Sequence, residues 1–195
     1  MIVRVVTPTP TEVFTLDEAK DFLRVDGTDE DTYITSLIQS AREAFEAFAS
    51  RYVLPTVVDE FLVGGFPVAK PYWPSDGLIY LSKPNVTAVA SVKYHNTSGA
   101  ETTYSTDDYR EFNVDSDFTG LESVDGWPSD CDTDRANAVT IRYTAGWADA
   151  SSVPGPVKDG MNLYMAQAYD NRMNNIKQLP TRVEFLWDKY RLRRF

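Results

Sequence analysis

Residues 29–52, DEDTYITSLIQSAREAFEAFASRY, form the longest stretch of regular hydrophobic periodicity in this chain. Acidic residues occupy positions 29–31, where the dipole of a helix favours negative charge, and Pro55 follows the stretch. The apolar side chains recur every three or four positions, which predicts one buried face of an amphipathic helix: Ile34, Leu37, Ile38, Ala41, Phe45, Phe48 and Tyr52.

A short helix is predicted immediately upstream. The sequence Thr15-Leu16-Asp17-Glu18 is a capping box, in which Thr15 caps the first turn and Glu18 reaches back to it. Asp26-Gly27 is expected to end this helix, because glycine suits the left-handed C-terminal position. Further upstream, Pro8 and Pro10 prevent a helix, so residues 1–13 are interpreted as an extended arm.

A second long helix is predicted near the C-terminus. Pro156 is a favourable first helical residue, and apolar residues then recur at helical spacing: Val157, Met161, Tyr164, Met165 and Ala168. Gly160 within it is either a mild defect or a close packing contact. An isolated helix with one apolar face is unstable in water, so we expect the early and late helices to cover one another.

The segment between these helices has the period-two pattern of strands. Strands are predicted at residues 57–63, 78–81, 86–94, 102–104, 109–114 and 139–143. The predicted fold is α+β: residues 1–54 and 153–195 form a helical bundle with a C-terminal tail, and residues 55–152 form an inserted antiparallel β-rich subdomain.

Composition restricts the chemistry. The 195 residues contain one cysteine, Cys131, and one histidine, His95, which excludes an intrachain disulfide and a thiolate zinc site within one chain. No cofactor or metal is expected. No apolar run approaches the roughly 20 residues that span a bilayer, and the N-terminus lacks the apolar core of a secretory signal. These features favour an intracellular or virion-assembled soluble protein that does not bind membranes.

Charge is distributed unevenly along the chain. Residues 170–195 carry seven basic and three acidic side chains, a net charge of +4, whereas the remaining residues carry 12 basic and 26 acidic ones, a net charge of −14. Such a body repels nucleic acid, and attraction to an acidic partner is confined to the tail.

Two acidic patterns leave other functions open. Residues 115–120 match the first half of a calcium loop but lack the acid expected at its twelfth position, where Gly126 stands, so a polar turn is the alternative. An acid-based, carbohydrate-active enzyme would use a pair of loop carboxylates, and solvated loop acids are the alternative. The candidate acids are Asp107, Asp108, Asp130, Asp132 and Asp134.

The C-terminal sequence WDKYRLRRF, residues 187–195, mixes aromatic and basic side chains. It is compatible with nucleic-acid binding, with a solvated helix end whose cations complement the helix dipole, or with a protein-interaction anchor.

The order of these segments resembles the head–tail connector (adaptor) family of long-tailed phages. The resemblance lies in the opening TLDEAKDFLRVDGTDEDTYITSLIQSAREAFEAFASRYVL, the Gly126-Trp127-Pro128 turn, the stretch AVTIRYTAGWADASSVPGPVKDGMNLYMAQAYDNR and the closing residues 190–195. It implies a non-enzymatic virion protein of the phage neck, assembled in the host cytoplasm.

The resemblance also implies partners. Family members form a homo-oligomeric ring, typically dodecameric, beneath the portal protein, which extends the channel for double-stranded DNA and receives the stopper or tail-terminator protein. The C-terminal tail of this chain is expected to enter an acidic groove of the portal and to become ordered only on docking. Its removal is therefore expected to leave the core folded. The partner-binding residues would be Trp187, Tyr190, Arg191, Leu192, Arg193, Arg194 and Phe195. A tail-completion or stopper protein is the alternative within the same class.

Overall fold

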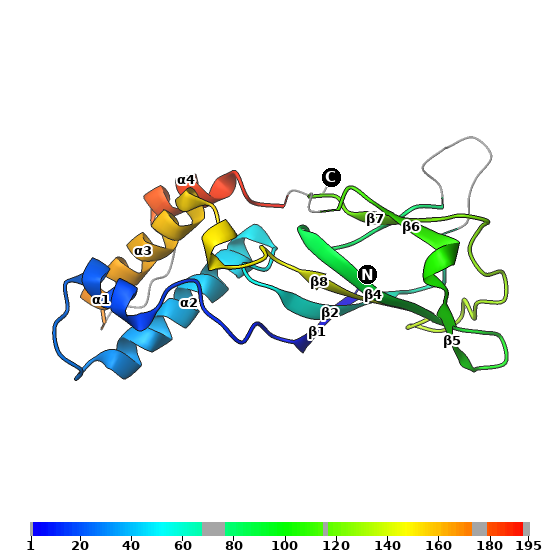
Figure 1. Ribbon diagram of the computed structural model, residues 1–195, viewed down its shortest axis with the longest axis horizontal. Helices are drawn as coiled ribbons and strands as arrows, with labels where there is room; N and C mark the ends of the chain where they lie inside the picture. Colours follow the sequence, from blue (N-terminus) through cyan, green and yellow to red (C-terminus); the bar gives the residue numbers. More distant parts are fainter. Residues whose placement is uncertain (1, 68–76, 115–116, 173–178, 193–195) are drawn as a thin grey trace. The chain divides into compact units, whose positions relative to one another are not determined.

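The computed structural model describes residues 2–67, 77–114, 117–172 and 179–192 (Figure 1). The chain forms two compact units. Residues 9–54 and 147–195 make a helical unit, and residues 1–8 and 55–146 make a β unit. The fold is therefore α+β, as predicted. Among the residues described, no helix is both long and apolar enough to cross a membrane.

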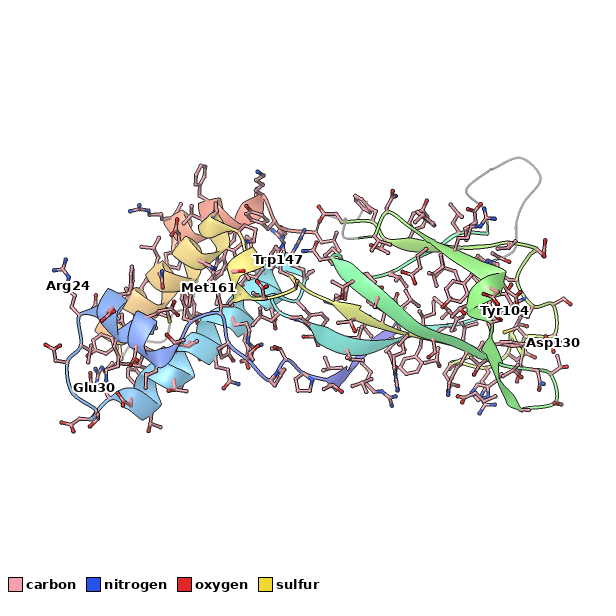
Figure 2. The ribbon with its side chains drawn as sticks, in the orientation of Figure 1. Arg24, Glu30, Tyr104, Asp130, Trp147 and Met161 are labelled. Carbon is pink, nitrogen blue, oxygen red and sulfur yellow. The ribbon has the colours of Figure 1, made fainter. Side chains whose placement is uncertain are left out.

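The helical unit is built around α2 (Asp31–Ala49), which corresponds to the predicted amphipathic helix. It packs with α1 (Leu16–Leu23), α3 (Gly155–Asp170) and α4 (Thr181–Asp188). One buried cluster joins Ile34, Leu37, Ile38, Ala41 and Phe45 of α2 to Val157, Met161 and Met165 of α3. Met161 lies among these helices in Figure 2. The prediction that the early and late helices cover one another is confirmed.

The helix termini follow local chemistry, with one correction. The capping box is present: Thr15 Oγ1 accepts the Glu18 N–H at 3.2 Å, and Glu18 Oε2 accepts the Thr15 N–H at 2.8 Å. The predicted end of α1 at Gly27 is wrong. Arg24 takes the left-handed conformation (φ 57°) and ends the helix three residues earlier, while Gly27 (φ 84°) lies in the loop that follows.

The β unit contains two antiparallel sheets. The larger has the strand order β1 (Ile2–Thr7), β2 (Thr56–Leu62), β8 (Val139–Ala145), β4 (Val86–His95) and β5 (Glu101–Tyr104). The smaller has the order β3 (Ile79–Tyr80), β7 (Gly120–Ser123) and β6 (Tyr109–Phe112), and the short 3-10 helix η1 (Thr106–Asp108) precedes β6. Strand β7 was not predicted, because its sequence GLES contains no β-branched or aromatic residue.

Both ends of the predicted helical bundle need correction. Residues 2–7 are not part of it: they form β1, which pairs with β2 in the register Ile2–Phe61 and Arg4–Asp59. The prolines that prevent a helix follow this β-branched segment and so do not prevent a strand. The other boundary lies at residues 146–147 rather than 152–153, because the Trp147 N–H donates to the Val53 carbonyl at 3.0 Å.

Each sheet of the β unit buries one face. In β2 the buried residues Val58, Glu60 and Leu62 alternate with residues of the other face. The Glu60 carboxylate accepts the Tyr143 hydroxyl at 2.7 Å and the N–H of Ser82, which follows β3, at 2.8 Å. This buried network joins the larger sheet to the segment beside the smaller one, so the smaller sheet covers the inner face of the larger (Figure 1).

Candidate functional site

The predicted C-terminal anchor begins with a core residue. Trp187 of α4 is completely buried, its Nε1–H donates to the Val157 carbonyl at 3.2 Å, and its ring meets Phe45 edge-on at 5.3 Å between centroids. Trp187 is therefore not part of an exposed tail. The expectation that residues 187–195 can be removed without disturbing the core is corrected, because their removal would empty the centre of the helical unit.

The residues after Trp187 also lie against the helical unit. Tyr190 meets Trp147 edge-on at 6.3 Å, the Arg191 guanidinium lies 5.2 Å from the centroid of the Phe48 ring, and the Leu192 N–H donates to the Ala49 carbonyl at 2.9 Å. Arg191 is exposed, and Tyr190 and Leu192 are half-buried. Arg193, Arg194 and Phe195 lie outside the described residues.

The outward side of α4 carries a residue that sequence reasoning missed. Phe185 is 81% exposed, between Arg182 one turn earlier and Lys189 one turn later, both also exposed. We call these three residues the α4 face. Its signal was present in the periodicity: Val183 and Trp187 are buried, and a residue midway between two buried positions four apart falls on the opposite side of a helix.

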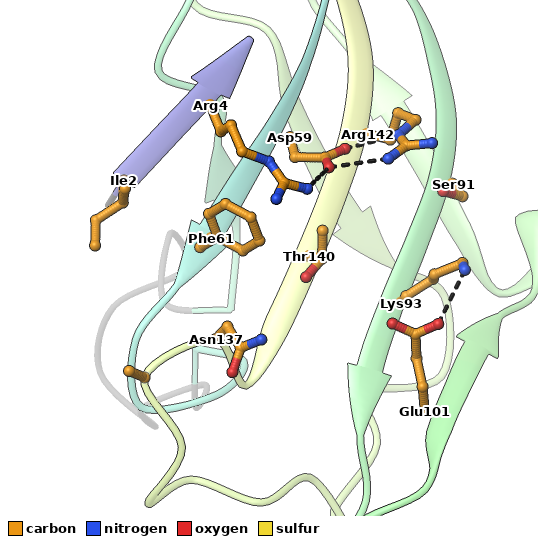
Figure 3. A pocket seen from close by; sticks show the side chains of 11 residues that line it. Ile2, Arg4, Asp59, Phe61, Ser91, Lys93, Glu101, Asn137, Thr140 and Arg142 are labelled. Carbon is orange, nitrogen blue, oxygen red and sulfur yellow. Dashed lines mark hydrogen bonds and ion pairs between the residues drawn. The ribbon is translucent and has the colours of Figure 1, made fainter. Parts of the chain in front are cut away.

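A second candidate surface is the open face of the five-stranded sheet. It contains a depression of about 410 Å³ (Figure 3). At its centre Asp59 accepts hydrogen bonds from Arg142 Nε at 2.7 Å, Arg142 Nη2 at 2.9 Å and Arg4 Nη2 at 2.7 Å. These bonds, those from Arg142 first, hold the pKa of Asp59 below its ordinary value.

The rest of this depression is both apolar and charged. Ile2 and Phe61 form an apolar part, while Lys93 Nζ pairs with Glu101 Oε2 at 3.0 Å and lowers the pKa of Glu101 (Figure 3). Arg4, Lys93 and Arg142 outnumber the two acids. We call this surface, centred on Ile2, Arg4, Asp59, Lys93 and Arg142, the sheet face.

A third surface is the outer side of the smaller sheet. Tyr80 and Phe112 are register partners of the same residue, Gly120, and their rings meet edge-on at 5.6 Å. A Cβ atom at Gly120 would lie 2.3 Å from Phe112 Cζ and 2.7 Å from the Ile79 carbonyl oxygen, so only glycine fits beneath the Phe112 ring. Phe118, 54% exposed, precedes this strand. We call Tyr80, Phe112 and Phe118 the aromatic face.

The two carboxylates of the depression in the sheet face are not suited to acid catalysis. Asp59 and Glu101, the two acids of the depression, are both ion-paired with lowered pKa values, so neither retains a proton to donate near neutral pH. The loop acids Asp107, Asp108, Asp130, Asp132 and Asp134 are not among its lining residues.

No metal centre is apparent in the described part of the chain, which contains no group of three or more His, Cys, Asp or Glu side chains suited to holding an ion. Asp115 and Ser116 of the predicted calcium loop lie outside it. Burial raises the pKa of the Cys131 thiol, so this lone cysteine is suited to packing rather than to nucleophilic chemistry.

The chain matches a known protein family over more than half of its length. The family described as phage gp6-like head-tail connector protein matches residues 14–124. No curated protein sequence matches the chain.

Among the solved structures that match, three align with the whole chain and with 97% of each matched chain. They come from the neck of an empty GTA particle computed with C6 symmetry (20% identity, TM-score 0.77), the virion of a native gene transfer agent particle (21%, 0.77) and the neck of a native GTA particle computed with C12 symmetry (19%, 0.73). At these identities the matches establish a shared fold.

Proposed function

The chain belongs to the phage gp6-like head–tail connector family, and from this membership we propose that it is a structural subunit of a virion neck. A connector is a structural virion protein and not an enzyme. In the proposed role, copies form a ring beneath the portal, extend the DNA channel and join the capsid to the stopper or tail. Assembly takes place in the host cytoplasm.

The observation that carries this proposal is the extent of the family match. Residues 14–124 include α1 and α2 of the helical unit and β2–β7 of the β unit, so the likeness covers parts of both units. The similar folds supply independent support, since two of them come from structures described as particle necks, computed with C6 and C12 symmetry, and the third comes from a virion. Cyclic symmetry is the arrangement that a closed ring of head-to-tail subunits requires.

Charge supports passage of DNA without retention. Residues 1–169 carry a net charge of −14, and proteins hold DNA mainly by neutralising phosphates with basic side chains. A ring of such subunits lacks that attraction, so double-stranded DNA slides through without specific binding.

Docking onto the portal is assigned to the basic C-terminal region. The α4 face offers one exposed phenylalanine between two cations, and Arg191, Arg193 and Arg194 follow it in the sequence. Aromatic and arginine side chains dominate the binding energy of protein interfaces, and this local excess of positive charge suits an acidic groove. Trp187 contributes by holding α4 in place and not by touching the partner.

The direct test is electron microscopy and co-sedimentation of the purified chain with the portal protein of the same particle. We expect rings bound to the portal. Deleting Arg193–Phe195 together with Arg191→Glu should weaken this binding while the far-UV circular dichroism spectrum stays unchanged. Binding to an isolated tail tube but not to the portal would overturn the proposal in favour of a stopper or tail-completion protein.

A further inference from the structure

Two exposed surfaces of the β unit lie on opposite sides of it. The smaller sheet covers the inner face of the larger, where Glu60 and Tyr143 are buried, so the sheet face points away from the smaller sheet. In β3, Ile79 is buried and Tyr80 is exposed, so the aromatic face points away from the larger sheet. One unit therefore presents two unlike surfaces in opposite directions.

The sheet face and the aromatic face are complementary in shape, and both contain apolar side chains. The sheet face is hollowed, with a depression of about 410 Å³ that has apolar parts at Ile2 and Phe61. The aromatic face carries the exposed ring of Phe118, together with Tyr80 and the half-buried Phe112. Exposed apolar groups gathered on a folded domain mark interaction sites, and large aromatic rings are the side chains that fill such depressions.

The two surfaces are also complementary in charge. The β unit as a whole carries seven basic and fourteen acidic residues, a net charge of −7. The sheet face departs from this excess, with Arg4, Lys93 and Arg142 against two acids. Around the aromatic face, Asp117 adjoins Phe118 and Glu122 follows Gly120 on β7, against Arg110 alone on β6. The sheet face thus has one more basic than acidic side chain, whereas the aromatic face has one more acidic than basic side chain. The sheet face of one copy and the aromatic face of a neighbouring copy therefore attract each other.

We propose that the sheet face of one copy binds the aromatic face of the next, and that this contact is the subunit interface of the ring. Unlike surfaces on opposite sides of one unit produce head-to-tail association, which closes into a ring when the rotation between copies permits. A partner of a different kind would need only one of the two surfaces. The inference rests on the proposed function for its ring and adds the surfaces that build it.

The test is cross-linking between two single-cysteine variants of the full chain, in a Cys131→Ala background and without portal. One variant carries Ile2→Cys and the other Phe118→Cys, and the mixture is treated with a flexible bismaleimide. The matched control replaces Ile2→Cys with Val63→Cys, because Val63 is 61% exposed, as Ile2 is 59% exposed, but does not line the sheet face. Circular dichroism verifies that each variant is folded.

We expect about tenfold more cross-linked heterodimer from the Ile2→Cys mixture than from the Val63→Cys mixture, because the proposed contact holds positions 2 and 118 of neighbouring copies together at a high effective concentration. A single chain carrying both Ile2→Cys and Phe118→Cys should give a ladder of covalent oligomers. Equal yields from the two mixtures, or dimers formed only between copies of Ile2→Cys, would overturn the inference.

The outcome is separable from that of the portal-binding test. Portal binding with no cross-linking above the control would leave the connector role intact and reject this interface. Cross-linking above the control in a chain that does not bind the portal would support the subunit interface and reject the proposed docking onto the portal.

Discussion

The indole of Trp187 lies directly against Gly160: a Cβ atom at that glycine would be 2.1 Å from Nε1 and 2.7 Å from Cδ1. The backbone of α3 thus approaches the ring of α4 at a distance that only glycine permits. The same indole donates its N–H to Val157 of α3 and meets Phe45 of α2. Three helices of the helical unit therefore converge on one side chain.

Gly160→Ala should destabilise the helical unit by about 1–2 kcal/mol, since overpacking costs about 1–3 kcal/mol and the higher helix propensity of alanine recovers up to about 1 kcal/mol. Urea denaturation followed by circular dichroism measures this. The control is Gly155→Ala at the start of α3, where no atom lies within 4 Å of the added Cβ. Equal stability of the two variants would contradict the close contact.

Substitutions of Trp187 and of Phe185 should affect different properties, the first stability and the second portal binding. Trp187→Ala is expected to cost about 3–5 kcal/mol, the range for truncating a buried tryptophan. Phe185→Ala should change stability by less than about 0.5 kcal/mol, because the ring is exposed, yet weaken portal binding about tenfold or more. Phe22→Ala is the control, since Phe22 is an exposed phenylalanine of α1 in the same unit. Equal portal binding by both phenylalanine variants would remove Phe185 from the docking surface.

Asp59→Asn should destabilise the β unit by about 2–4 kcal/mol, because it leaves Arg4 and Arg142 without the buried carboxylate that both contact. Glu101→Gln removes an acid of the same face whose pair with Lys93 is exposed, so its cost should stay below about 0.5 kcal/mol. Thermal denaturation of the two variants provides the comparison, and similar losses would show that Asp59 is not central to the sheet.

The effect of Asp59→Asn should depend on pH. The pKa of Asp59 is held below its ordinary value of 3.8 by hydrogen bonds from Arg142 and Arg4. A depressed pKa in the folded state means that the charge stabilises the protein at pH values above 3.8 and that this stabilisation is lost as pH falls through the depressed pKa. The difference in free energy of unfolding between wild type and Asp59→Asn should therefore be full at neutral pH and shrink in acid. If this difference in free energy of unfolding stayed constant as the pH fell through the depressed pKa, the charge of Asp59 would not be the source of the stabilisation.

The helices of the core were predictable because their signals are local. The apolar stripe from Ile34 to Phe48 and the capping box at Thr15 each depend on residues within a few turns of each other. The strand β1 was missed for the opposite reason. Its register partners in β2 lie 50 to 59 residues away in the sequence, and nothing in the segment IVRVVT indicates which strand it will pair with.

The candidate surfaces depended even more on distant contacts. Trp187 reads as an exposed anchor beside Arg191, and only its packing with Val157 and Phe45 makes it a core residue. Conversely, the exposure of Phe185 follows only once Val183 and Trp187 are known to face inward, because the helical periodicity then places Phe185 on the opposite side of α4.

The amino-acid sequence by itself determined the α+β class, the two principal helices, most strands and the uneven charge, because periodicity, capping and composition are properties of neighbouring residues. Only the tertiary structure decided which aromatic side chains are buried, where β1 pairs and which faces of the β unit stay open. Those outcomes depend on contacts between segments far apart in the chain, whose pairing is selected by the burial and hydrogen bonding of the whole unit.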